Sequence, residues 1–484
     1  MNDVPRGLIA SNRREMLRKC GLGAGMLGLA TLLGEDHARA SSAAPLAARG
    51  GHFPAKAKSV IWLFINGGPS QVDTFDYKPA LAKWQGKSLK EVDSTFTETT
   101  GFFKDQVGGL MPSPFAFRQH GQCGKWVSSL FPNLREHVDK MAFIHSAYSE
   151  SNNHSPALFM MNSGLPRMGY PCVGSWVTYG LGCESRSLPA FVVMSDPRGR
   201  GLPKGNANNW SAGFLPSVYQ GTWLKPQGDP IDNLRRSEQL TDAQQRRHLD
   251  ALREANALHL AERPEDEELA ARIESFEMAY RMQTEAPLAL DLQQEPQHIH
   301  KLYGLDDERC AHFAAQCLLA RRLVERGVRF VQIYSGGMDN QLSWDGHMDI
   351  VGNHTQFAGE TDRPIAGLLA DLAQRGLLDD TLVVWGGEFG RLPIAQTGEK
   401  PGRDHNPHAA TYWLAGGGIR GGVSYGATDE VGYRAVENTV HVNDLHATML
   451  HLLGLDHTEL TYRYNGRQFR LTDVAGRVLE PILA

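Results

Sequence analysis

Short apolar runs that end in glycine or in polar loops recur along the chain. A run of this kind is typical of a strand covered on both faces, as in a parallel sheet with helices on either side. The runs lie at residues 59–65, 141–146, 188–194, 328–334, 381–385 and 410–415. They predict an α/β fold with a mostly parallel central sheet.

Segments with helical periodicity alternate with these runs. Two charged segments rich in alanine and leucine, 242–262 and 265–284, predict exposed amphipathic helices. We assign both to a helical insertion at about 229–297. Further amphipathic helices are expected at 307–325 and 363–375, each followed by an apolar run.

The first forty residues have the pattern of an export signal. Arg13 and Arg14 precede a modest apolar run at 21–33, and Ala38-Arg39-Ala40 offers a small-residue cleavage site. A bilayer-spanning helix needs roughly 20 apolar residues, and this run is shorter. The pattern predicts a twin-arginine (Tat) signal peptide at 1–40, a linker at 41–57 and one α/β domain at 58–484.

The signal implies use of the Tat export machinery and a periplasmic or extracellular location. No other stretch of the sequence is apolar for long enough to cross a bilayer. We therefore expect no stable membrane anchor after the signal is removed.

Composition narrows the possible partners. The chain has 484 residues, a formal charge of −5 and a pI near 6.4. A protein with this charge balance has no broad basic surface, which argues against a nucleic-acid-binding role.

Carboxylate and imidazole side chains gather just beyond the ends of the apolar runs. Ligands collect beyond the carboxyl ends of strands in parallel α/β sheets. Mixed oxygen and imidazole ligands suit zinc, manganese or iron, or calcium if oxygen dominates. The sequence therefore predicts a divalent metal site formed by Asp73, Asp345, His347, Glu388, Asp404, His405 and His408.

Residues that act on a substrate are expected near this site. Arg391 or Arg403 would clamp the non-bridging oxygens of a tetrahedral ester. Ser155 is the expected N-cap of a helix running to Gly164, where aligned backbone N–H groups favour an anion. An anion would therefore bind at this helix N-terminus, and Ser155 as a cap alone is the alternative.

Several strings together resemble one exported bacterial family. They are GGPSQVDTFDYKP, NHSPALFMMNSG, VVWGGEFGR, GRDHNPHAATYWLAGGGIRGG and HVNDLHATMLHLLGLDH. They are similar to the family called domain of unknown function 1501, sulfatase-like members of the alkaline phosphatase superfamily. The resemblance implies an alkaline-phosphatase-like, three-layer α/β/α sandwich with a metal site at the strand ends.

The resemblance also implies roles for individual residues. Glu388 stands where a metal-binding Asp is expected, and Phe389 stands where a metal-binding His is expected, so one ligand is replaced. Asp345 and His347 resemble the superfamily's Asp and His ligand pair, and His405 resembles its late histidine.

Two further positions depart from the superfamily. His154 occupies the place of the sulfatase nucleophile, and a histidine cannot become formylglycine. Asn66 stands where the ligand after the first strand is often found, which leaves Asp73 as the candidate. Standard sulfatase chemistry is therefore not expected. Instead, His154 would act on the ester as a phosphoryl or proton acceptor, or Ser155 would be the nucleophile.

Two functions remain open from the sequence. The first is an exported metal-dependent hydrolase of sulfate or phosphate esters, acting on a small molecule or a glycan. The second is a non-catalytic periplasmic protein with a degenerate site that binds a sulfated or phosphorylated glycan or an envelope partner.

Overall fold

The computed structural model describes residues 45–95, 101–225, 230–231, 234, 236, 239–263, 267–338 and 340–484. The predicted signal peptide at 1–40, with Arg13 and Arg14, lies outside these residues. The predicted linker is described only from residue 45. Within the described ranges, no helix combines the length and apolar character needed to cross a membrane.

A nine-stranded sheet forms the centre of the molecule, with the order β14-β5-β13-β9-β1-β8-β6-β7 and with β17 also paired to β5. The strands from β9 to β7 in this order are parallel, and β13 is antiparallel to both neighbours. The strands are β1 (Ser59–Ile65), β5 (Met141–Tyr148), β6 (Phe191–Met194), β7 (Thr222–Leu224), β8 (Phe330–Ser335), β9 (Thr381–Gly386), β13 (Ala410–Ala415), β14 (Val423–Tyr425) and β17 (Val440–His441).

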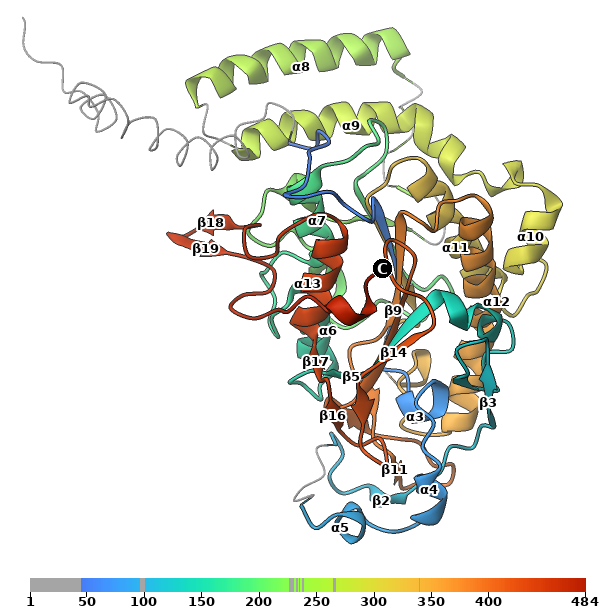
Figure 1. The fold of residues 1–484 in the computed structure, drawn as a ribbon. Coiled ribbons are helices and arrows are strands. Elements are labelled where there is room, and N and C mark those ends of the chain that lie inside the picture. The colour runs from blue at the N-terminus through green and yellow to red at the C-terminus, as the bar shows by residue number, and fades with distance from the viewer. Residues whose placement is uncertain are drawn as a thin grey trace, which may run out of the picture.

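Helices cover both faces of this sheet (Figure 1). On one side lie α11 (Ala311–Glu325) and α12 (Ile350–Gln374). On the other lie α6 (His154–Ser163), α7 (Val173–Leu181) and α13 (Val442–Leu452). The predicted three-layer α/β/α fold with a mostly parallel sheet is confirmed. Every residue of β1, β8, β9 and β13 is buried, which explains their continuous apolar runs.

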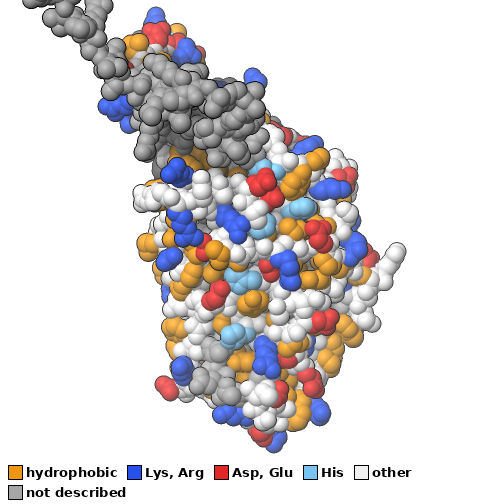
Figure 2. Space-filling view, turned by 60° about the vertical axis from the view of Figure 1, so that its left-hand side comes forward, with side chains coloured by type: hydrophobic (Ala, Val, Ile, Leu, Met, Phe, Trp, Pro, Cys, Tyr) orange, Lys and Arg blue, Asp and Glu red, His pale blue; other side chains and the backbone are white. Residues whose placement is uncertain are grey.

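Two long helices form a hairpin outside the three layers (Figure 1). They are α8 (Asp242–Glu262) and α9 (Glu267–Leu290), and α8 buries none of its residues. Acidic and basic side chains are interspersed on the face of the molecule seen in Figure 2.

The remaining helices and strands are short. They are α3 (Gln71–Thr74), α4 (Ala80–Lys83), α5 (Leu89–Val92), α10 (Gln297–Tyr303), β2 (Val107–Leu110), β3 (Phe117–His120), β4 (Lys125–Ser128), β10 (Gly390–Arg391), β11 (Ile394–Gln396), β12 (His405–Asn406), β15 (Ala427–Thr428), β16 (Ala435–Glu437), β18 (Tyr462–Tyr464), β19 (Arg467–Phe469), and the 3₁₀ helices η1 (Leu134–Lys140), η2 (Asn206–Trp210), η3 (Ser217–Tyr219), η4 (Leu292–Gln294), η5 (Asn340–Leu342) and η6 (Glu480–Ile482).

Two predicted helix starts are wrong. Helix α12 begins at Ile350 instead of residue 363, because the Asp349 side chain caps it and Pro364 is accommodated inside the helix. Helix α6 begins at His154, and its N-cap is Asn153, whose side chain accepts a hydrogen bond from the Ser155 amide. Ser155 is therefore not the cap.

Lys125 on β4 is buried without a carboxylate partner among the described residues. Its Nζ contacts His145 Nε2, lies 3.2 Å from Ser424 Oγ and lies 4.4 Å from the centre of the Phe143 ring. Burial lowers the pKa of this amine from its ordinary value of 10.5 to about 8. The fold therefore disfavours the charged form of Lys125.

We expect Lys125→Met to raise the free energy of unfolding at pH 7 by about 1–3 kcal/mol, because it removes a buried charge. Between pH 8 and about 10.5 the unfolded chain keeps the Lys125 proton while the folded chain has lost it, so this group adds stability as the pH rises. The advantage of the variant should therefore shrink from pH 7 to pH 10. Urea unfolding of both proteins at the two pH values tests this. A variant that is less stable at pH 7 would contradict the assignment.

Candidate metal centre

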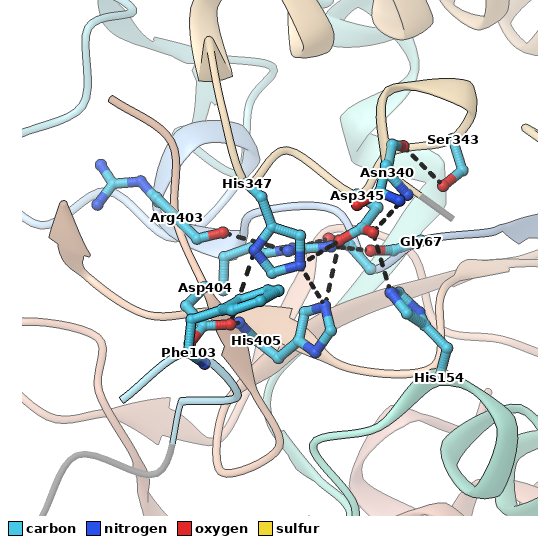
Figure 3. Close-up of polar contacts among 12 residues, drawn as sticks. Gly67, Phe103, His154, Asn340, Ser343, Asp345, His347, Arg403, Asp404 and His405 are labelled. Carbon is cyan, nitrogen blue, oxygen red and sulfur yellow. Dashed lines mark hydrogen bonds and ion pairs between the residues drawn. The ribbon is translucent and has the colours of Figure 1, made fainter. Parts of the chain in front are cut away.

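Four buried side chains meet beyond the ends of the sheet strands: His154, Asp345, His347 and His405. Asp345 and His347 follow β8, His405 lies on β12 in the connection from β9 to β13, and His154 is the first residue of α6. One ligand atom from each side chain lies within 4.8 Å of those of the other three. Figure 3 shows the three imidazoles turned toward the Asp345 carboxylate. We call these four residues the His3Asp cluster.

The Asp345 carboxylate is the centre of the cluster. Its Oδ1 lies 3.0 Å from His347 Nε2 and 3.1 Å from His405 Nε2. Its Oδ2 lies 3.2 Å from His154 Nε2. The Nε2 atoms of His347 and His405 are themselves only 2.9 Å apart.

The other nitrogen of each imidazole faces a hydrogen-bond acceptor. The Nδ1 atom of His154 lies 2.8 Å from Glu388 Oε1. The Nδ1 of His347 lies 2.7 Å from Gln396 Oε1, and the Nδ1 of His405 lies 2.6 Å from the Asn152 carbonyl oxygen. An imidazole that donates from Nδ1 has, when neutral, its lone pair on Nε2. The three Nε2 atoms converge on one carboxylate.

This arrangement favours the binding of a cation. The buried Nε2 of His154 lies close to Asp345 but lacks a hydrogen bond of good geometry. Three imidazoles and one carboxylate suit zinc, manganese or iron, and they do not suit calcium, which takes oxygen ligands. Outer hydrogen bonds from Nδ1 to carboxylates or carbonyls are typical of metal-binding histidines. The residues present thus fit a divalent transition metal.

The electrostatic environment shifts the pKa values of three of the four ligands, and not all in the same direction. Burial lowers the pKa of His405 well below its ordinary value, which keeps this imidazole neutral. Burial opposes ionisation of Asp345, but Arg391 and the three imidazoles together hold the pKa of that carboxyl well below its usual range. For His154, burial lowers the pKa, but the neighbouring carboxylates of Asp345 and Glu388 outweigh burial and raise the pKa to about 9. A proton thus competes with a metal for His154.

Arg391 forms an ion pair with the Asp345 carboxylate of the cluster. Its Nη2 lies 2.6 Å from Asp345 Oδ1 and also donates to the Gly67 carbonyl oxygen. Its Nε donates to the Gly68 carbonyl at 2.8 Å, and its Nη1 donates to the Arg403 carbonyl at 3.1 Å. Every nitrogen of this buried guanidinium therefore has a protein acceptor, and one of these acceptors is Asp345.

Glu388 and Asp404 border the cluster without belonging to it. Glu388 Oε1 accepts from the Gly67 amide at 3.0 Å as well as from His154 Nδ1, so it orients that histidine. Asp404 Oδ1 accepts from the His405 amide at 2.7 Å and lies 3.7 Å from His347 Nδ1.

Three other predicted site residues lie outside the cluster. Asp73 forms a buried ion pair with Arg403 at 2.6 Å. His408 is half-buried, with its ring 6.2 Å from that of Tyr433. Ser155 is half-buried on the first turn of α6.

Sequence reasoning missed two of the three residues that orient the imidazoles. Gln396 and Asn152 carry no pattern that marks them, because an amide or a backbone carbonyl in a loop is common everywhere in a sequence. Only the tertiary structure shows that they face Nδ1 atoms.

A family model described as "Protein of unknown function (DUF1501)" matches residues 57–483. The chain belongs to the DUF1501 family. The family resemblance seen in the sequence motifs is thereby confirmed. No curated protein matches the chain.

Solved structures similar to this DUF1501 chain include three hydrolases. The alkaline phosphatase from the Antarctic bacterium TAB5 has 10% identity and a TM-score of 0.34, with 83% of this chain and 99% of that chain covered. A sulfatase from Pseudoalteromonas sp. has 12% identity and a TM-score of 0.34, with 82% and 68% covered. A phosphonate monoester hydrolase from Silicibacter pomeroyi has 13% identity and a TM-score of 0.32, with 73% and 71% covered.

Proposed function

We propose that this DUF1501 chain is an exported, metal-dependent hydrolase of phosphate or sulfate esters. The observation that carries the proposal is the convergence of three imidazole Nε2 atoms on the Asp345 carboxylate. A divalent ion held there supplies Lewis-acid polarisation of an ester oxygen. The ester class follows from the sequence resemblance to sulfatase-like proteins, and export follows from the predicted Tat signal at 1–40.

The chain's own residues have distinct tasks in this proposal. His154, Asp345, His347 and His405 hold the metal. Glu388 keeps the Nδ1 proton on His154, which leaves Nε2 free as a ligand. We therefore assign His154 to metal binding rather than to accepting a phosphoryl group, and Ser155, the next residue on α6, is the remaining candidate nucleophile.

The number of ligands in the cluster favours a second function. Its four buried ligands are enough for a complete tetrahedral set, as in structural zinc sites that leave no open position. Phe389, which replaces an expected metal-binding histidine, lies with its ring 4.5 Å from that of His405. Both features favour a non-catalytic periplasmic protein that keeps the metal and binds a sulfated or phosphorylated glycan or an envelope partner.

Plasma mass spectrometry of the purified mature protein, before metal is added, should find near-stoichiometric zinc, manganese or iron. His405→Gln should lose most of this metal, because one of the converging Nε2 atoms is removed. His408→Gln is the matched control and should keep it, since His408 lies outside the cluster.

The same preparations separate the two functions. Turnover of phosphate or sulfate esters by the metal-loaded protein, lost in His405→Gln, supports the hydrolase. A metal-loaded, well-folded protein that hydrolyses neither class favours the binding function. A folded protein that stays metal-free after reconstitution would refute the metal centre itself.

A further inference from the structure

Two phenylalanines line the His3Asp cluster. The ring of Phe103 meets that of His347 edge-on, with centroids 4.9 Å apart. The ring of Phe102 lies 5.7 Å from that of His405 and is packed edge-on against Phe103 at 5.1 Å. Phe102 is 45% exposed although it borders a buried cluster. We call Phe102 and Phe103 the aromatic wall.

The wall is attached to the cluster through one carboxylate. Asp404 Oδ2 accepts from the Phe103 amide at 2.7 Å, while its Oδ1 accepts from the His405 amide at 2.7 Å. Figure 3 shows Phe103 and Asp404 beside His347 and His405. Asp404 therefore fixes the wall and a metal ligand relative to each other.

The residue before the wall has no room for a side chain. A Cβ atom on Gly101 would lie 2.4 Å from Asp404 Oδ2. Glycine at this position lets the backbone approach the carboxylate closely enough for the Phe103 hydrogen bond. The position of the wall is thus specified by packing and not only by its own hydrogen bond.

The exposed ring of Phe102 beside the metal-ligand candidates suits a substrate that carries a flat apolar face. All four cluster residues are buried, and beside them lies the exposed ring of Phe102, 5.7 Å from that of His405. An anionic group that reaches the cluster from this side would bring its remaining part against Phe102. Aromatic faces attract flat apolar surfaces by stacking and by removing them from water.

We propose that Phe102 determines the specificity of the site by receiving a flat apolar ring face on the ester's leaving group, either an aryl ring or the C–H face of a pyranose. Asp404 and Gly101 act as positioning residues for the wall. The inference rests on the proposed function, because it assumes that the anionic group of the ester lies at the His3Asp cluster.

Binding of non-hydrolysable anions tests this without requiring turnover. Titration calorimetry on the metal-loaded protein should show phenylphosphonate, or benzenesulfonate in the sulfate series, binding about three- to tenfold more tightly than its methyl analogue. A pyranosyl phosphonate, compared with the same methyl analogue, distinguishes a sugar face from an aryl face.

Phe102→Ala should abolish the preference for the ring and keep its metal, whereas Phe102→Tyr should retain the preference. Tyr464→Ala is the matched control, because Tyr464 is a similarly exposed aromatic, 42% exposed, on β18. Gly101→Ala should weaken the preference by displacing the wall.

The outcomes separate this inference from the function on which it rests. A ring preference that survives in Phe102→Ala, or the absence of binding by every ring-bearing anion, would overturn it. A ring preference that depends on Phe102, in a protein that hydrolyses no ester, would refute the hydrolase and leave the wall as the specificity element of a binding site.

Discussion

Asp345→Asn should remove the bound metal and, with it, the stabilisation that the metal provides. The asparagine keeps the shape of the side chain but lacks the negative charge on which three imidazoles and Arg391 converge. A ligand present at a thousandfold excess over its dissociation constant stabilises the folded state by about 4 kcal/mol. Leaving the buried Arg391 without its anion costs a further roughly 3–5 kcal/mol.

Denaturant unfolding with and without a chelator measures both effects. The unfolding midpoint of the wild-type protein should fall when the chelator is added, and that of Asp345→Asn should start lower and not respond. Asp380→Asn is the matched control, because Asp380 forms a partly exposed ion pair with Lys58. Such pairs contribute about 1 kcal/mol or less. A chelator response in Asp345→Asn equal to that of the wild-type protein would exclude the cluster as the metal site.

Asp73→Ala should destabilise the protein by about 3–5 kcal/mol, because it leaves a buried guanidinium unpaired. Asp73 and Arg403 have fully buried side chains, joined by contacts of 2.6 Å and 3.2 Å. Burial raises the pKa of Asp73, but Arg403 outweighs it and the net pKa is lowered. Because folding lowers this pKa, the carboxylate stabilises the fold at pH values above its unfolded-state pKa. This stabilisation is lost as the pH falls through the folded-state pKa.

The double variant Asp73→Ala/Arg403→Met distinguishes a structural role from a ligand role. If Asp73 only neutralises Arg403, removing both charges should restore much of the stability and the metal content, since a buried pair replaced by apolar residues is often tolerated. Equilibrium unfolding and metal analysis of the single and double variants give the answer. A double variant that is as stable as the wild type yet metal-free would show that Asp73 is a ligand.

Much of the fold could be predicted because its signal is local. The runs at 59–65 and 381–385 became β1 and β9, since a strand buried on both faces needs an apolar residue at every position. The hairpin helix α8 matches its predicted bounds, because the alternation of charged and apolar residues is visible in the sequence alone. The prediction failed at the start of α12, because the helix begins at Ile350 with the Asp349 side chain as its cap and contains Pro364 in its interior.

The sequence by itself determined the family, the α/β class and the fact that carboxylates and imidazoles gather beyond the strand ends. Only the tertiary structure decided which of them meet. His154 and His405 are 251 positions apart in the chain, yet their rings lie 4.4 Å apart. Asp73, in contrast, forms an ion pair with Arg403 and lies outside the cluster. The physical reason is that a ligand set depends on the relative placement of loops from separate strands, and that placement is set by long-range packing rather than by residue spacing.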